Sequence, residues 1–156
     1  MAEVFTIEPA STRPLWVLAV IAAFLLALLL LFGFFAYSSR NTRFEVTPLG
    51  LDIRGTLYGR SIAWADLDVE QARTVDLREA SELQPTLRTN GVGLPGYQLG
   101  WFRLRRQGRG LLFLTDRSRV VALPTRAGYT ILLSVHEPDA FLEALRRAAP
   151  TSSRGG

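Results

Sequence analysis

Residues 15–37 form the longest apolar stretch of the chain and include no charged residue. As a helix with a rise of about 1.5 Å per residue, the stretch is about 34 Å long, enough to cross a hydrocarbon core of about 30 Å once. Trp16 and Tyr37 stand near its two ends, where amphipathic aromatic side chains favour the headgroup layer. The pattern predicts a single transmembrane helix at residues 15–37, preceded by an N-terminal tail at residues 1–14.

A cleaved signal peptide is the alternative interpretation of this stretch, because Ala36-Tyr37-Ser38 has the small-x-small pattern of a cleavage site. The apolar run is longer than the usual core of a signal peptide, however, and Glu3 and Glu8 stand where a signal peptide carries positive charge. We therefore expect the span to remain as an anchor, which makes the protein a single-pass component of the cell membrane.

The arginines that flank the span predict its orientation. Only Arg13 precedes it, whereas Arg40, Arg43 and Arg54 follow it within about 20 residues, and the positive-inside rule then places the C-terminal part in the cytoplasm. Alanine recurs at every fourth position on one face of the span, which favours close approach of a second copy and a homodimer through the span. These alanines are Ala19, Ala23 and Ala27.

After the span, short runs alternate between apolar and polar residues, the period of a β-strand. Residues 43–47 and 51–54 are separated by Pro48-Leu49-Gly50 and are typical of a hairpin. Further strands are predicted at residues 61–64, 69–77, 97–106, 111–115, 119–123 and 129–135. About seven antiparallel strands indicate a sandwich or barrel, in an α+β chain that is mainly β.

A helix follows at Pro138, a residue that suits a first helical turn. Phe141, Leu142 and Leu145 recur at helical spacing, so this amphipathic helix is expected to pack on the sheets and to close a domain at residues 40–149. Residues 150–156 are rich in Ser, Gly and Pro and are predicted to be a disordered tail.

Composition excludes several kinds of chemistry. The chain has no cysteine and a single histidine, His136, so disulfides, thiol catalysis and multi-histidine metal sites are excluded. The formal net charge is +4, and all 18 basic residues are arginine. We expect no cofactor and no bound metal, and the modest charge of a tethered chain argues against nucleic acid as a partner.

The motifs that resemble enzyme sites lack their structural context. Gly91-Val92-Gly93-Leu94-Pro95-Gly96 is a literal GxGxxG, but a dinucleotide site needs that loop to open a helix, and a strand is predicted after it. His136 stands just before the last helix, where a solvent-exposed or capping role is expected. Asp66 and Asp68 are typical of a solvated pair that shares a strand face or flanks a turn. The sequence predicts that the protein is not an enzyme.

Several stretches resemble the bacterial pleckstrin-homology-like domains of small membrane-anchored proteins. They are residues 44–48 (FEVTP), 58–64 (YGRSIAW), 88–97 (RTNGVGLPGY), 114–121 (LTDRSRVV), 124–125 (PT), 128–129 (GY) and 132–134 (LLS). The resemblance covers about residues 43–147. It implies the pleckstrin-homology fold and an adaptor-like role, and it implies no settled biochemical activity.

The stretch from Arg88 to Tyr97 is the first candidate binding site. It is predicted to be a loop in which Asn90-Gly91 and Pro95-Gly96 form tight turns, or in which backbone N–H groups cradle an anion or a peptide carbonyl. The two interpretations differ in whether the loop is a scaffold or a site. The residues of this candidate are Arg88, Asn90, Gly91, Gly93 and Tyr97.

A basic cluster on the following strand is the second candidate. Trp101, Arg103 and Arg105 alternate on one predicted face, and Arg106 and Arg109 extend the charge into the next turn. Such a cluster is either a solvated face of a basic protein or a surface for anionic lipid. The sequence therefore predicts an interaction module that recruits an unknown protein partner at the membrane, with a sensor of anionic lipid or another anionic ligand as the alternative.

Overall fold

The computed structural model describes residues 13–80 and 82–150. The chain divides into two compact units, Met1–Ser38 and Ser39–Gly156. Most of the predicted N-terminal tail and residues 151–156 of the predicted C-terminal tail lie outside the described residues.

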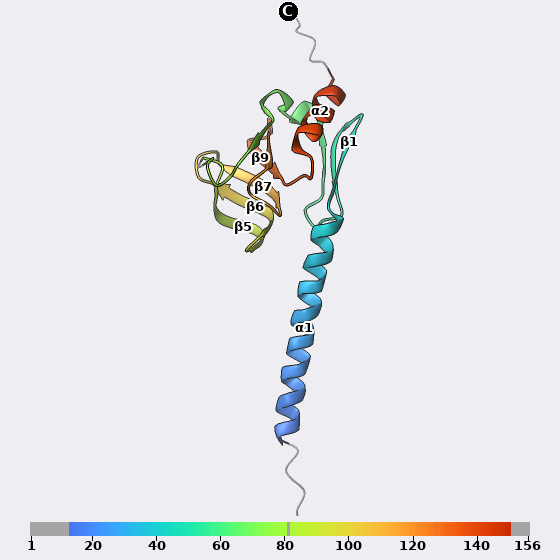
Figure 1. Cartoon of the computed structure of the whole chain (residues 1–156), viewed down its shortest axis with the longest axis vertical. Helices are drawn as coiled ribbons and strands as arrows, with labels where there is room; N and C mark the ends of the chain where they lie inside the picture. Colours follow the sequence, from blue (N-terminus) through green and yellow to red (C-terminus); the bar gives the residue numbers. More distant parts are fainter. Residues whose placement is uncertain (1–12, 81, 151–156) are drawn as a thin grey trace, which may run out of the picture. The chain divides into compact units, whose positions relative to one another are not determined.

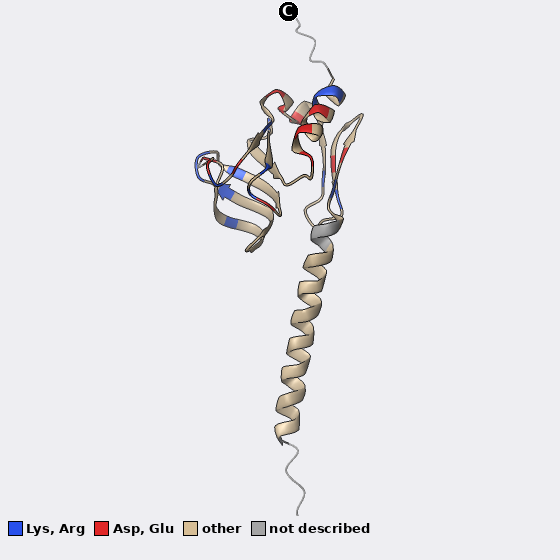
Figure 2. Ribbon diagram, viewed as in Figure 1, with Lys and Arg blue, Asp and Glu red and all other residues tan. Residues whose placement is uncertain are grey.

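Helix α1 (Arg13–Asn41) contains the predicted span and continues beyond both of its ends. The segment Pro14–Tyr37 has a mean hydropathy of 3.1 and is long and apolar enough to cross a membrane. It holds no charged residue (Figure 2). Most of its large apolar side chains are exposed. Hydrocarbon is the environment that such a surface favours, because exposing it to water is costly.

A three-stranded antiparallel sheet begins the second unit. It has the order β1 (Arg43–Thr47), β2 (Gly50–Arg54), β3 (Ser61–Ala63). The predicted hairpin at residues 43–54 is confirmed, since β1 pairs with β2 across a two-residue turn. The Thr47 hydroxyl donates to the Gly50 carbonyl (2.9 Å), and the Trp64 indole N–H donates to the Pro48 carbonyl (3.1 Å), which fixes the turn.

A six-stranded sheet follows, with β5, β6, β7 and β9 side by side (Figure 1). Its order is β4-β8-β9-β7-β6-β5, and its strands are β4 (Arg73–Val75), β5 (Pro85–Leu94), β6 (Tyr97–Leu104), β7 (Arg109–Leu114), β8 (Val120–Pro124) and β9 (Tyr129–Leu133). The described residues therefore form nine strands rather than about seven. The expectation of antiparallel pairing fails at one place, because β7 and β9 are parallel.

Two predicted segments have a different structure. Residues 69–77 are not one strand: a 3-10 turn (Val69–Gln71) buries Val69, and the short β4 follows. Residues 88–97 are not a loop. They form most of β5, a two-residue turn at Pro95-Gly96 and the first residue of β6, so the predicted turn at Asn90-Gly91 is wrong and the one at Pro95-Gly96 is confirmed.

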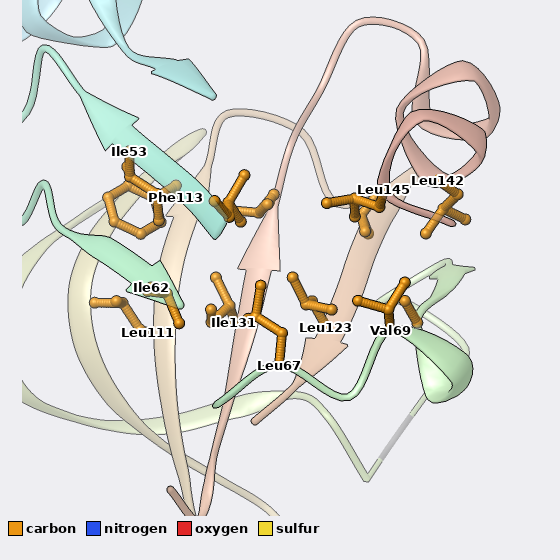
Figure 3. Close-up of a cluster of buried hydrophobic side chains, with 14 of the residues drawn as sticks. Ile53, Ile62, Leu67, Val69, Leu111, Phe113, Leu123, Ile131, Leu142 and Leu145 are labelled. Atoms are coloured by element: carbon orange, nitrogen blue, oxygen red, sulfur yellow. The ribbon is translucent and has the colours of Figure 1, made fainter. Parts of the chain in front are cut away.

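Helix α2 (Pro138–Ala148) begins with proline in its first turn and closes the main core, as predicted. Its buried Leu142 and Leu145 belong to one cluster with residues of both sheets, and Figure 3 shows them facing the side chains of the strands. The Phe44 ring lies between those of Phe113 and Phe141, at centroid distances of 5.9 and 6.3 Å. Burial of these apolar side chains is the main stabilising contribution to the domain.

The other face of the six-stranded sheet carries a second, smaller core. Phe102 and Leu104 of β6 pack there with Leu77 and Leu83, which come from the segment between β4 and β5. The Gln84 side-chain amide donates to the Leu77 carbonyl (3.0 Å) and so closes this segment on itself. Both faces of the sheet are therefore covered over its middle strands, whereas β5 lies at one edge.

Candidate binding surface on the β5–β6 hairpin

Strand β5 forms one edge of the six-stranded sheet, and most of its side chains are exposed. Its pairing with β6 places Arg88 opposite Phe102 and Asn90 opposite Trp101, with register shifts on either side of Leu87 and Arg88. Phe102 belongs to the smaller core and Trp101 packs against the main core, so these two pairs lie on opposite faces of the sheet. The residues predicted as one loop site are therefore divided between two faces.

A groove of about 470 Å³ lies on the Arg88 face, beside the end of the hairpin. Arg88 and Arg117 both border it, and Figure 2 shows arginines on β5 and β6 and in the nearby turns. Within residues 13–80 and 82–150, neither of these two guanidinium groups forms an ion pair. The other lining residues are Gly93, Leu94, Pro95, Gln98 and Phe102.

The turn that carries Arg117 is held by hydrogen bonds on both sides. The Ser134 hydroxyl accepts from the backbone N–H groups of Thr115 (3.1 Å) and Asp116 (3.2 Å), and it donates to the Asp116 carbonyl (2.7 Å). The Leu77 N–H donates to the Arg117 carbonyl (2.8 Å). The backbone position of Arg117 is thus fixed, while its side chain is exposed.

Asp116 is adjacent to Arg117 but is bonded elsewhere. Its carboxylate accepts from the Ser118 N–H (2.9 Å) and the Ser118 hydroxyl (2.8 Å). These hydrogen bonds favour the charged form and hold the pKa of the Asp116 carboxyl below its usual range. The acid closest in sequence to Arg117 is therefore engaged with the turn.

The glycines of the predicted loop have different roles. Gly91 lies opposite Gly100, and a Cβ atom on Gly91 would be 2.2 Å from the Leu99 carbonyl oxygen. Gly91 therefore permits the close approach of the two strands, which is a structural role. A Cβ atom on Gly93 would be 3.6 Å from the Phe102 ring and 3.8 Å from Cδ of Arg88, an ordinary contact distance, so Gly93 leaves the groove open.

The other face of the hairpin carries the aromatic part of the predicted basic cluster. The Trp101 ring packs edge-on against Tyr129 (5.0 Å between centroids), and the guanidinium groups of Arg60 and Arg109 lie 5.1 and 5.8 Å from its centroid. These are cation–π distances. Trp101 is therefore partly covered rather than displayed, and Arg109 contributes to that cover.

The remaining residues of the cluster are more exposed. Arg103 lies on β6 opposite Arg109. Because β6 ends at Leu104, Arg105 belongs to the turn and not to the strand as predicted, and Arg106 lies in the turn. Arg109, predicted in that turn, is the first residue of β7. On the same face the Tyr58 hydroxyl donates to the Asn90 side-chain carbonyl (3.0 Å). Asn90 is thus tied to the connection between β2 and β3 and is not free to bind a ligand without losing that bond.

Two polar atoms at the start of β6 lack partners. The Tyr97 hydroxyl and Oε1 of Gln98 are both buried and have no hydrogen bond within the described part of the chain. Buried polar atoms normally form hydrogen bonds, so these two unsatisfied atoms are exceptions. Gln98 lines the groove with Arg88, whereas Tyr97 lies at the smaller cavities next to it.

The groups considered for catalysis remain apart. His136 is exposed just before α2, Asp66 ends a 3-10 turn, and Asp68 stands between two such turns. Over residues 13–80 and 82–150, no three side chains of His, Asp or Glu come together as metal ligands.

Arg117 and Gln98 were missed by the sequence analysis. The signal that could have found them is the pairing of β6 with β7, which places Gln98 opposite Leu114 at the end of β7. The turn after Leu114 then lies beside the end of the β5–β6 hairpin. Because the sequence did not predict β5 as a strand, it could not show that Arg117 lies near this hairpin.

The two sheets and the C-terminal helix share one core, and a long apolar helix precedes them in the chain. This architecture is that of a PH-like domain with an N-terminal apolar helix. The chain belongs to the bacterial PH domain family, whose model matches residues 42–149. The resemblance found in the sequence and the predicted fold class are thereby confirmed. No curated protein and no solved structure matches the chain.

Proposed function

We propose that this bacterial PH domain is a non-enzymatic interaction module that recruits a protein partner at the membrane. In this proposal α1 stays uncleaved as a single-pass anchor, and the domain faces the cytoplasm. The anchor keeps the domain close to the membrane surface, which raises its effective concentration for partners that are held there too.

The single observation that carries the proposal is the exposed edge of β5. This strand has ten residues, and it pairs only with β6 among the described strands. An exposed sheet edge can accept an extended peptide as an additional strand, with main-chain hydrogen bonds for affinity and side-chain contacts for specificity. Leu87, which is 58 % exposed on this edge, adds an apolar contact that such a peptide would cover.

Anionic lipid is the second candidate ligand, and unpaired arginines on the other face favour it. Arg103, Arg105 and Arg106 form no ion pair in the described ranges. Near an anionic leaflet each arginine contributes about 1 kcal/mol of attraction, a value that falls off within a Debye length. Arg109 adds less to this surface, because its guanidinium lies over Trp101.

Site-specific photocrosslinking in native membranes tests the protein partner. A photoreactive residue at Leu87 is expected to capture a discrete protein, whereas the same residue at Leu57 is not. Leu57 is a matched control because it is 70 % exposed and lies in the connection between β2 and β3. Equal capture at both positions, or none at Leu87, would count against recruitment through β5.

Hydrogen exchange of the full chain in nanodiscs tests the lipid. If anionic lipid is the ligand, the amides of residues 103–109 gain protection when phosphatidylglycerol is added to phosphatidylcholine. If the protein partner is the ligand, exchange is the same in the two lipid compositions. The two candidates are thus distinguished on the same preparation.

A further inference from the structure

We infer that the groove bordered by Arg88 and Arg117 binds an acidic side chain of an extended peptide that pairs with β5. This inference rests on the proposed recruitment of a protein partner and names the chemistry of that partner. It concerns the face of the hairpin opposite to the predicted basic cluster. We refer to the space lined by Arg88, Gly93, Leu94, Pro95, Gln98, Phe102 and Arg117 as the arginine groove.

Charge is the first argument. Arg54, Arg73, Arg78 and Arg119 lie within 4 Å of carboxylates, the closest being Arg54 and Asp52 at 2.9 Å. Arg88 and Arg117 come from distant parts of the chain, border one groove and have no such partner in the described residues. Two unpaired guanidinium groups at one concave site favour an anion, and their planar geometry suits a carboxylate.

Preorganisation is the second argument. The turn around Arg117 is fixed by Ser134 and Leu77, and Asp116 is engaged by Ser118. Asp116 and Arg117 form no ion pair in the described ranges, and little backbone ordering is left to oppose binding. On the other side of the groove, Arg88 is held on a strand rather than on a flexible loop.

The lining of the groove favours a peptide over a small anion. Leu94 and Phe102 border the groove beside the two arginines and add apolar side chains to its lining. A carboxylate side chain and its apolar stem together match this lining, whereas a free anion uses only the arginines. Because Arg88 itself belongs to β5, a side chain of a strand added to that edge would lie beside Arg88 on the face that carries the groove.

Register gives the pattern of the peptide. Side chains of an added strand alternate between the two faces of the sheet, so every second one lies on the Arg88 face. The inferred partner segment therefore has an acidic residue on the Arg88 face and, at a neighbouring position on the other face, an apolar residue beside Leu87. The pairing of Leu87 with Arg103 and of Arg88 with Phe102 supports this alternation.

Fluorescence anisotropy of labelled peptides tests the inference on the full chain in uncharged detergent. The probe is an acetylated hexapeptide that alternates glutamate and valine, and the reference is the same peptide with glutamine in place of glutamate. We expect the glutamate peptide to bind at least about tenfold tighter, because hydrogen bonds to charged groups are the strong ones. The double variant Arg88→Ala with Arg117→Ala should abolish this difference.

Two further variants make the test specific. Arg126→Ala with Arg147→Ala lowers the net charge by the same two units on exposed residues outside the groove, and it should keep the preference within about twofold. Gly93→Val leaves every charge in place but fills the groove beside Phe102, and it should reduce the preference. Equal losses in the two double variants would show general electrostatic attraction and overturn the inference.

A competition experiment distinguishes a lipid headgroup from a peptide as the source of the anion. Comparison with the photocrosslinking result then shows whether the groove assignment or the proposed recruitment has failed. Glycerol phosphate, a soluble lipid headgroup, should not displace the glutamate peptide at concentrations where the unlabelled peptide does; if it does, the groove is a lipid site and the inference is wrong. The photoreactive residue at position 87 can also be placed in the Arg88, Arg117 double variant. If it captures the same partner there as in the otherwise unchanged chain, the groove assignment fails while recruitment stands. If the glutamate preference holds but no partner is captured, recruitment fails instead.

Discussion

Gly91 and Gly100 face each other across β5 and β6, where a side chain on either would enter the opposite backbone. Gly100 has a φ of +110°, and a Cβ atom there would lie 2.5 Å from the Asn90 carbonyl oxygen. Gly93 is only two residues from Gly91 and has neither constraint. Adjacent glycines of one sequence motif thus contribute differently, one to strand approach and one to the open groove.

We expect Gly100→Ala to destabilise the domain by about 1 to 3 kcal/mol, because it combines a positive φ with a backbone clash. Gly93→Ala is the matched control and should change stability by no more than about 0.5 kcal/mol. Denaturant unfolding of the full chain measures both. Similar losses in the two variants would contradict this assignment of roles.

The Asp116 carboxylate predicts a dependence of stability on pH. Because the Ser118 N–H and hydroxyl lower the pKa of Asp116 in the folded state, its contribution is present above the unfolded value of about 3.9. It is lost as the pH falls from there through the lower folded pKa. Asp116→Asn should therefore be less stable than the wild type at pH 7, with a difference that shrinks in acid below about pH 3.9. A difference in unfolding midpoint that stays constant down to pH 3 would argue against the carboxylate.

At the scale of elements, α2 closes the main core through a single buried stripe. Leu145 is fully buried, whereas Glu143 on the same helix is exposed. Leu145→Ala should lower the free energy of unfolding by about 2 to 5 kcal/mol, and Glu143→Ala should be close to neutral. Thermal unfolding measures the pair. A shift within error for Leu145→Ala would show that α2 is not docked.

The sequence predicted those elements that have a clear hydrophobic pattern over the whole segment. The first hairpin, β6, β9 and α2 have a periodic pattern, whereas β7 and β8 are short continuous apolar runs. All are present close to the expected places. Strand β5 was not predicted, because Asn90, Gly91, Gly93, Pro95 and Gly96 have the local chemistry of turns. Its pairing with β6 depends on the Gly91–Gly100 contact, a tertiary feature that propensity does not contain.

The residues of the candidate site could be predicted only in part from the sequence. Arg88, predicted to belong to a loop site, lies on strand β5 and borders a groove. Asn90 and Trp101 were interpreted as ligand-binding residues, yet the structure engages them with Tyr58 and with Arg60 and Tyr129. Those partners come from other strands and connections, so only the folded sheet could identify them.

At the scale of the whole molecule, the chain combines an apolar helix with a bacterial PH domain. We expect the purified protein to retain the helix, because Glu3 and Glu8 make a poor signal-peptide leader. Intact mass measurement of the protein extracted from membranes checks this expectation. A mature N-terminus at or near Ser39 would show that the helix is cleaved off and that it does not anchor the mature protein.

In the proposed function, β5 and the arginine groove together recruit an acidic protein segment at the membrane. The most direct measurement compares the yield of photocrosslinking from Leu87 in three full-length chains in native membranes. They are the otherwise unchanged chain, the Arg88→Ala, Arg117→Ala variant and the Arg126→Ala, Arg147→Ala variant. We expect one discrete product that is strong in the first, lost in the second and retained in the third. Equal yields in the second and third chains would contradict it.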